Sequence, residues 1–391
     1  MTDLLTLEAA IEAVLVRSAA LPAERVALGE AGGRVLAAPA LALVDLPPFA
    51  SSAMDGFALR SADTPGRLPV VARIAAGSPS PQALRPGEAM GIATGGVVPE
   101  GADAVVPIER VVQQGDNIDI AQTVGQSDNV RSRGGDAREG DVVLEAGTRL
   151  GAAQVGAMAA AGIPELVCAR RPRVAVLATG SELRTPGETL EPGEIYEANS
   201  AMLATALREY GADVEQLAPV RDDEDAHRDA LARALEADVV VSSGGVSVGP
   251  HDLVRRVAAE LGVEEVFWRV AVKPGKPISF GVRGATLLFG LPGNPVSTLV
   301  GFELFVRPAL RALEGERDPG PRFRQAPLAR PVRRNDARDE LVRARWRDGA
   351  LEALSGQESH MIVRAAGADA LVLVPRGDGE LAGEVSYLPL G

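Results

Sequence analysis

The sequence predicts a multi-domain α/β protein whose central domain is built on a doubly wound, mostly parallel sheet. Between Arg173 and Leu313, apolar runs alternate with amphipathic stretches, which is typical of parallel strands covered by helices. Short β-branched segments between glycine and proline turns flank this region and predict two small β-rich domains. The length of 391 residues allows several domains, and a hydrophobic content of 46% with 24% charged residues is that of a folded globular protein.

Changes of sequence character divide the chain into four parts. An amphipathic helix is expected over residues 6–20 with Thr6 as its N-cap, and an alanine-rich helix over 147–163. Because a β-rich insert separates these helices, we expect them to form one discontinuous helical linker domain. The predicted boundaries are 1–42 plus 137–170 for the linker domain, 43–136 for the small β-rich domain, 171–318 for the α/β domain and 319–391 for the C-terminal β domain.

Within the α/β region each expected strand is a continuous apolar run, and each expected helix has its own start signal. A helix is predicted over 199–210, with Asn199 as candidate N-cap and Gly211 at its end. The helix over 221–237 begins with a cluster of acids. The other expected elements are strands at 173–180, 212–220, 238–245 and 285–291, a helix at 252–262 and a long helix that ends near residue 313.

Charge and cysteine content exclude several classes of function. A formal net charge of −13 argues against nucleic acid or an anionic membrane surface as the main partner. Cys168 is the only cysteine, so an intrachain disulfide and a multi-cysteine metal site are excluded. No apolar run approaches the roughly 18 residues of a membrane helix, and the acidic start lacks the features of a signal peptide. We therefore expect a cytoplasmic protein without a membrane partner.

Polar loops follow four of the predicted strands. Because the carboxyl ends of parallel strands meet at one edge of a sheet, we expect several of these loops to converge on one crevice. Hydroxyls and backbone amides in such loops suit phosphate groups. The loops are TGSEL (179–183), RDDED (221–225), SSGGVSVGPHD (242–252) and GLPGNP (290–295), and their candidate substrate-binding residues are Thr179, Ser181, Ser242, Ser243, Gly244, Gly245, Ser247, Gly293 and Asn294.

Three acids in the same loops, Glu182, Asp222 and Asp252, predict a metal ion. Two unit charges about 4 Å apart repel by roughly 4 kcal/mol at an effective dielectric constant near 20. A helix N-terminus returns only about 0.3–1 kcal/mol. A hard cation such as Mg²⁺, sharing oxygen ligands with phosphate, resolves this repulsion. The alternative is that each acid only adds charge to the start of a helix, and Asp222 taken alone fits that alternative.

A non-helical segment, WRVAVKPGKPISFG (268–281), carries the cations Arg269, Lys273 and Lys276. Its prolines stiffen the loop, which suits holding positive charge toward an oxyanion. The Walker A and G-x-G-x-x-G motifs are absent, which excludes the corresponding nucleotide-binding classes. An anionic substrate is therefore expected beside the acidic crevice.

These loops together resemble the molybdopterin molybdenumtransferase family, the MoeA family, to which the E domain of gephyrin is related. The segments SSAMDGFAL, IATGGVVPEGADAVVPIE and VRSRGGDAREGD extend the similarity over nearly the whole chain, in the family's order. The resemblance implies an enzyme that inserts molybdate into adenylylated molybdopterin, releasing AMP, to form molybdenum cofactor. It implies an elongated homodimer whose site lies between the α/β domain of one subunit and the small β domain of the other. Transient contacts with molybdopterin adenylyltransferase and apo-molybdoenzymes are also expected.

The resemblance also assigns roles to individual residues. It implies that Asp55, Thr94 and Asp136 act from the β-domain side and Lys273 from the α/β side. With Arg269 and Lys276 from the segment above, these are the predicted catalytic residues. It adds Pro292, Pro295 and, from the C-terminal domain, Ser359 to the substrate-binding residues.

Three positions depart from the family pattern. Arg269 stands where lysine is common and replaces a compact ammonium with a planar fork. Gly135 stands where an acid is frequent, which puts a metal role of that loop in doubt, and Phe57 replaces a frequent tyrosine.

Alternative functions remain open at this stage. A molybdopterin adenylyltransferase shares the α/β core but does not account for the extra domains or the SAMDG segment. A tungstate-selective enzyme would share every motif. A non-catalytic scaffold that binds a receptor peptide would not need the acids and lysines described above.

Overall fold

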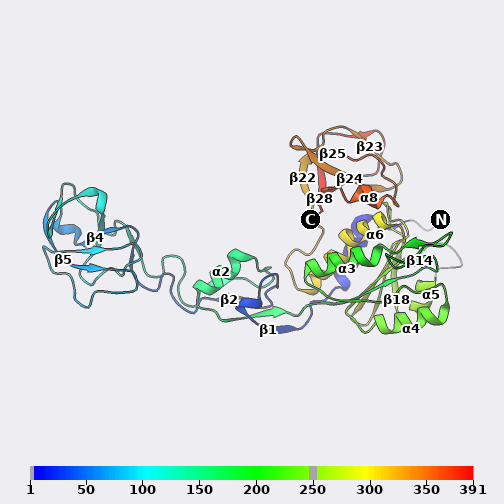
Figure 1. Ribbon diagram of the computed structural model, residues 1–391, viewed down its shortest axis with the longest axis horizontal. Coiled ribbons are helices and arrows are strands. Elements are labelled where there is room, and N and C mark those ends of the chain that lie inside the picture. The colour runs from blue at the N-terminus through cyan, green and yellow to red at the C-terminus, as the bar shows by residue number, and fades with distance from the viewer. Residues whose placement is uncertain (1–3, 246–252, 391) are drawn as a thin grey trace.

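The computed structural model describes residues 4–245 and 253–390. The molecule is elongated, with a small β unit at one end, a narrow linker, and the α/β unit with the C-terminal β unit at the other end (Figure 1). No helix within the described ranges is long and apolar enough to cross a membrane.

The α/β unit contains the predicted sheet. Its strands follow the spatial order β16-β13-β17-β21-β20-β18. The first four are mutually parallel and β20 is antiparallel to both of its neighbours, so the expected doubly wound, mostly parallel sheet is confirmed. The bounds are β13 (Arg173–Ala178), β16 (Asp213–Gln216), β17 (Val239–Ser243), β18 (Glu264–Trp268), β20 (Ser279–Arg283) and β21 (Thr286–Leu291).

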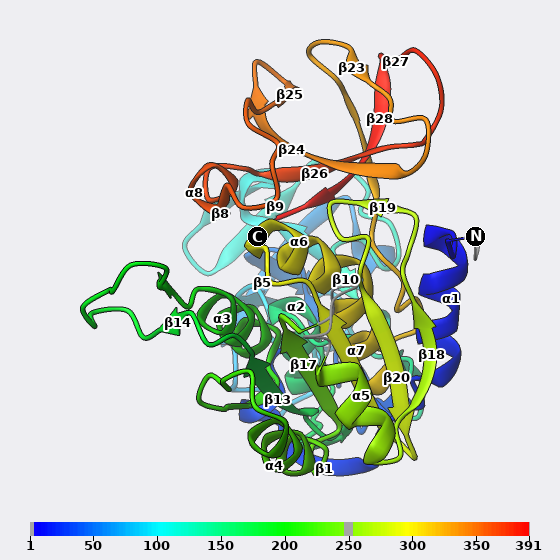
Figure 2. The same ribbon diagram turned by 90° about the vertical axis from the view of Figure 1, so that its right-hand side faces the viewer.

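Helices cover both faces of this sheet (Figure 2). Successive residues of β13 point to opposite faces, so Val176 joins one apolar cluster and Leu177 the other. The first cluster contains side chains of α3 (Asn199–Tyr210), α6 (Pro295–Gly301) and α7 (Arg307–Leu313); the second contains those of α4 (Glu224–Ala234) and α5 (Leu253–Glu260). Burial on both faces explains why the strands are continuous apolar runs.

The N-terminal helix α1 (Leu7–Arg17) begins as expected, because the Thr6 hydroxyl accepts a hydrogen bond from the Ala9 amide at 3.2 Å. Its position differs from the expectation. Its buried residues, among them Leu7 and Val14, pack into the apolar cluster of the α/β unit beside α7, and not into the linker. The apolar stripe predicted the helix correctly, but a stripe does not specify which surface covers it.

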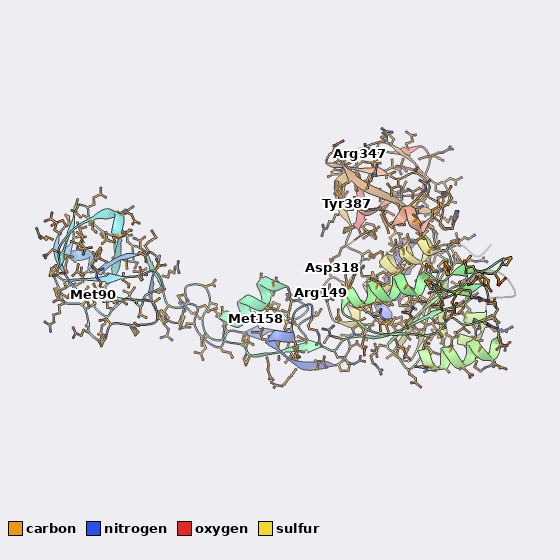
Figure 3. The ribbon with its side chains drawn as sticks, in the orientation of Figure 1. Met90, Arg149, Met158, Asp318, Arg347 and Tyr387 are labelled. Carbon is orange, nitrogen blue, oxygen red and sulfur yellow. The ribbon has the colours of Figure 1, made fainter. Side chains whose placement is uncertain are left out.

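The linker has a core of its own. Its strands β1 (Ala23–Ala27) and β12 (Glu165–Ala169) pair antiparallel, and the predicted alanine-rich helix forms α2 (Ala152–Ala160). Met158 of α2 is fully buried there (Figure 3). A short pair, β2 (Ala40–Leu41) and β11 (Val142–Leu144), leads toward the distal unit.

Two small β units complete the molecule, as predicted. The distal unit is a sheet of order β7-β4-β6-β5-β9-β8, and the C-terminal unit a sheet of order β19-β24-β26-β28-β22. The distal strands are β4 (Gly56–Leu59), β5 (Gly66–Ile74), β6 (Ala89–Ile92), β7 (Ala104–Pro107), β8 (Val111–Gln114) and β9 (Asn117–Ile120). The C-terminal strands are β22 (Arg324–Pro327), β24 (Asp339–Arg347), β26 (Ala370–Val374) and β28 (Glu384–Pro389), with β19 (Val272–Lys273) contributed by the α/β unit.

Candidate functional site

A cavity of about 560 Å³ opens at the carboxyl ends of β13, β17 and β21. β13 lies between β16 and β17, the next two strands of this sheet along the chain. The cavity therefore lies where the chain changes direction across the sheet, the usual place for a ligand in such folds. The predicted loops converge here as expected, and the predicted residues that line the cavity are Thr179, Glu182, Asp222, Ser243, Gly244, Gly245, Pro292, Gly293 and Asn294.

Backbone hydrogen bonds tie these loops to one another. The Thr179 amide donates to the Ser243 carbonyl at 2.9 Å, and the Gly244 amide to the Leu291 carbonyl at 3.0 Å. Gly244 has a φ of +92°, and a Cβ placed on it would lie 2.5 Å from the Thr179 carbonyl oxygen. Only glycine fits this close approach, so this glycine sets the shape of the cavity.

Asn199 and Thr179 provide buried polar atoms at this cavity. Asn199 is the first residue of α3 and not its N-cap as expected; its side-chain amide donates to the Ser243 hydroxyl at 2.6 Å and to the Gly293 carbonyl at 2.7 Å. The Asn199 Oδ1 and Thr179 Oγ1 atoms are buried and have no hydrogen-bond partner within the described ranges. Buried polar atoms are nearly always satisfied in native proteins, so these two atoms suit a polar ligand.

The acidic side of the cavity is formed by Glu182 and Asp222. The Ser181 hydroxyl accepts a hydrogen bond from the Asp222 amide at 2.9 Å, while the Ser181 amide donates to the Asp222 carboxylate at 3.3 Å. Nearby Arg184 pairs with Glu194, and no lysine or arginine of the described ranges pairs with Glu182 or Asp222. Two carboxylates that make no ion pair with these described residues fit a hard cation as ligand.

The third predicted metal ligand, Asp252, and the predicted binding residue Ser247 lie outside the described residues. Within the described part of the chain, no group of three histidine, cysteine or carboxylate side chains is arranged to hold a metal ion. The three-carboxylate ligand set therefore stays a prediction.

Several cavity residues were not predicted as site residues, among them Glu197 and Pro277. Glu197 is only 7% exposed, lines the cavity, and accepts a hydrogen bond from the Ser200 amide at 2.9 Å. Pro277 reaches the cavity from the KPGKP loop. An acid directly before a helix that starts at a strand-end crevice is the signal that could have identified Glu197.

The predicted cations lie around the cavity without lining it. Lys273 forms an ion pair with Glu340 of the C-terminal unit, at 3.0 Å. Arg269 has a φ of +76°, and its guanidinium lies 3.9 Å from the centre of the Trp268 ring. Lys276 is exposed. The KPGKP loop thus joins the α/β unit to the C-terminal unit, a role that its sequence did not predict.

Two of the predicted serines have different environments. The Ser242 side chain is fully buried and its hydroxyl donates to the Phe289 carbonyl at 3.3 Å, so the strand pleat turns it away from the cavity while Ser243 faces it. Ser359 approaches from the C-terminal unit: its hydroxyl accepts from the Asn294 side chain at 2.9 Å. Pro295 is the first residue of α6, directly after Asn294.

Asp55, directly before β4, and Thr94, after β6, lie in the distal unit, which is far from this cavity (Figure 1). Asp136 lies on the segment between the distal unit and the linker, where its amide donates to the Leu46 carbonyl at 2.8 Å. Asp55, Thr94 and Asp136 are all exposed. The Thr94 amide donates to the Asp55 carboxylate at 2.7 Å and the Thr94 hydroxyl at 3.0 Å. These two hydrogen bonds, the amide first, hold the pKa of Asp55 below its usual value. One chain alone does not bring these residues to the cavity.

Comparison with known proteins gives a consistent result along the whole chain. Residues 5–162 match the family described as "MoeA N-terminal region (domain I and II)", residues 175–312 the "Probable molybdopterin binding domain", and residues 325–389 the "MoeA C-terminal region (domain IV)".

Individual relatives agree. The chain is 38% identical to molybdopterin molybdenumtransferase 2 of Mycobacterium tuberculosis over 374 residues, 91% of this chain and 92% of that protein. It is 33% identical to a molybdopterin molybdenumtransferase of Staphylococcus aureus, over 94% of this chain and 91% of the relative. A crystal structure of a molybdopterin biosynthesis moeA protein from Pyrococcus horikoshii is 31% identical with a TM-score of 0.82, covering 99% of both chains.

Proposed function

Because the chain belongs to the molybdopterin molybdenumtransferase family, we propose that it inserts molybdate into adenylylated molybdopterin, with release of AMP, to form molybdenum cofactor. The observation that carries this proposal is the convergence of the β13, β17 and β21 loops on one polar cavity. Its volume of about 560 Å³ is that of a pocket for a small organic ligand. The unsatisfied atoms of Asn199 and Thr179 offer hydrogen bonds to such a ligand.

Mg²⁺ is the proposed cofactor, held by Glu182 and Asp222 beside the cavity. When bound, Mg²⁺ neutralises the charge of a pyrophosphate. The chain's own part is to orient the ligands: Ser181 holds Asp222 through hydrogen bonds at both its hydroxyl and its amide. The amide of Gly245, which lines the cavity beside Gly244, provides a donor for phosphate oxygens.

Positive charge for molybdate comes from the KPGKP side of the site. Arg269 and Lys276 have no ion-pair partner within the described ranges, so their charge is available to an oxyanion. Lys273 is neutralised by Glu340 in the free protein. We assign to Lys273 a role that requires this pair to open.

The active protein is proposed to be a homodimer, because Asp55, Thr94 and Asp136 need a second subunit to reach a cavity (Figure 1). The linker offers a surface for such a contact. A strip of exposed apolar side chains lies on it: Leu41, Leu43, Val44 and Val142, which are 46%, 52%, 39% and 50% exposed. Contiguous exposed apolar surface of this kind marks interaction sites. The cytoplasm is the proposed compartment, in line with a single, buried cysteine, Cys168.

The decisive experiment mixes the purified protein with adenylylated molybdopterin, molybdate and Mg²⁺, and measures bound molybdenum and released AMP. We expect the two to appear in equal amounts. Transfer of AMP from ATP onto molybdopterin would instead identify an adenylyltransferase, and preferential incorporation of tungstate in a competition assay would identify a tungsten enzyme. If neither product forms and cells that carry only the Asp55→Ala protein still make cofactor, the scaffold alternative holds.

A further inference from the structure

The joint between the linker and the α/β unit is built from charged side chains. Within the described ranges, the apolar cluster of the linker and that of the α/β unit share no residue. Leu21, at the boundary of the two parts, packs on the cluster of the α/β unit and donates its amide to the Leu313 carbonyl at 2.7 Å. The orientation of the linker therefore depends on directional polar contacts.

Arg149 is the centre of these contacts, at the narrow neck of the molecule (Figure 3). Its Nε donates to Glu316 at 2.6 Å, and its Nη2 donates to Glu314 and to the Tyr210 hydroxyl. Its Nη1 donates to the Gly33 carbonyl of the linker at 2.5 Å. The side chains of Glu314 and Glu316 are each only 3% exposed, so these contacts are shielded from water.

The planar geometry of its guanidinium lets Arg149 orient the linker relative to the α/β unit. Its five donors lie in one plane in a fixed fork, so acceptors on two sides define an angle and not only a distance. The guanidinium also stacks on the Tyr210 ring, with 4.6 Å to the ring centre. Arg322, which leads into the C-terminal unit, pairs with the same Glu316. The network thus ties the linker, α3, the residues after α7 and the C-terminal unit to one another.

Arg149 itself is held firmly in the linker. It forms a β-bridge with Val35, and its neighbour Leu150 is 1% exposed in the linker core. The distal unit lies at the far end of this linker (Figure 1), so a small rotation at the neck displaces Asp55 much further than it displaces Arg149.

We infer that the network of Arg149, Tyr210, Glu314 and Glu316 fixes the angle between the two halves of the chain. Arg149 is then a positioning residue that sets where Asp55 and Thr94 meet the cavity of the second subunit. The positioning of Asp55 rests on the proposed function, whereas the fixed angle does not.

The test replaces the fork but keeps the charge, with Arg149→Lys. Labels are placed on two exposed positions, Gln82→Cys in the distal unit and Glu209→Cys in α3, and labelled chains are diluted with unlabelled protein. The native Cys168 is fully buried and stays unlabelled. We expect the label–label distance distribution to broaden. We also expect kcat to fall by roughly 10- to 100-fold, since a misplacement of about 1 Å can cost about 100-fold, while KM for adenylylated molybdopterin stays unchanged.

Arg25→Lys is the matched control, because Arg25 is exposed and pairs with Glu165 inside the linker; its distances and kcat should equal those of the wild type. An unbroadened distribution in Arg149→Lys overturns the inference, whatever the activity. If that variant does not fold, Tyr210→Phe removes one acceptor and should broaden the distribution less; a wild-type distribution there also overturns it. A wild type that shows the fixed distance but inserts no molybdenum would refute the proposed function alone.

Discussion

The two ends of this molecule carry predicted site residues in opposite settings. In the α/β unit, the predicted residues Thr179 and Ser243 are buried and, with Asn199, line a cavity whose polar atoms are partly unsatisfied. In the distal unit, Asp55 and Thr94 stand exposed and satisfy each other. Under the proposed function, the cavity of the α/β unit binds the pterin substrate, whereas Asp55 and Thr94 act on substrate that another surface holds. The comparison therefore predicts that binding and chemistry depend on different ends of the chain.

The largest effect is expected from closing the cavity, with Gly244→Ala. The new Cβ would meet the Thr179 carbonyl at 2.5 Å, and backbone strain of about 1–3 kcal/mol corresponds to a loss of up to about 100-fold in affinity. Isothermal titration with adenylylated molybdopterin measures it. Gly284→Ala is the control, because Gly284 also has positive φ but a Cβ there meets no atom within 4 Å. Equal affinities in the two variants would show that the cavity does not bind the pterin.

A smaller loss, confined to turnover, is expected from Asp55→Asn. Removing the distal carboxylate should lower kcat by about 100-fold if it handles a proton or orients molybdate, and leave pterin affinity as it was. Asp116→Asn is the control, because Asp116 is an exposed turn acid of the same unit, and this substitution should leave kcat and pterin affinity unchanged. A parallel fall in pterin affinity would show that Asp55 also contributes to substrate binding.

Mixing two inactive variants sharpens the comparison further. Chains with Asp55→Asn are co-refolded with chains carrying Asp222→Asn. In a shared-site dimer, half of the molecules are mixed and each has one intact site, so roughly a quarter of wild-type activity should return. Activity that stays at the level of the single variants would place each site within one chain.

The smallest effect concerns protonation of Asp55. Thr94→Val removes the hydroxyl but keeps the amide, so the pKa of Asp55 should rise part of the way back toward its ordinary value of 3.8. Because the hydrogen bonds from Thr94 lower the pKa of Asp55 in the folded state, they stabilise the fold at pH values above the unfolded-state pKa. This stabilisation is lost as the pH falls through the folded-state pKa. The carboxyl-carbon NMR shift of Asp55 measures the titration. An unchanged midpoint would show that the Thr94 hydroxyl does not lower the pKa of Asp55.

Much of the α/β unit follows from sequence alone. Periodicity places the strands and helices, and the parallel arrangement brings the TGSEL, SSGG and PGNP loops together because strand ends share one edge. The linker, the distal β unit and the C-terminal β unit were also expected. These features depend on local pattern and on one topological rule.

What escaped prediction depends on contacts between distant segments. Lys273 was expected at the substrate but pairs with Glu340, since no pattern near the KPGKP loop reveals a strand that docks on it. Glu197 was missed because its burial results from three loops closing over it. The Arg149 network joins residues more than 160 positions apart, and each of its charged members resembles an ordinary surface charge in the sequence.

The position of α1 has a consequence for how the chain acquires its structure. The helix is translated before the sheet that buries Leu7 and Val14, which begins only at Arg173, and before α7, which ends at Leu313. A helix of 11 residues is marginal on its own in water, whereas the linker and the distal unit have cores of their own. On the ribosome, the linker and the distal unit can fold before α7 is synthesised, whereas α1 can pack only after α7 has formed. A chain trimmed to begin at residue 171 would keep the whole sheet but leave that apolar face bare, and would aggregate during refolding.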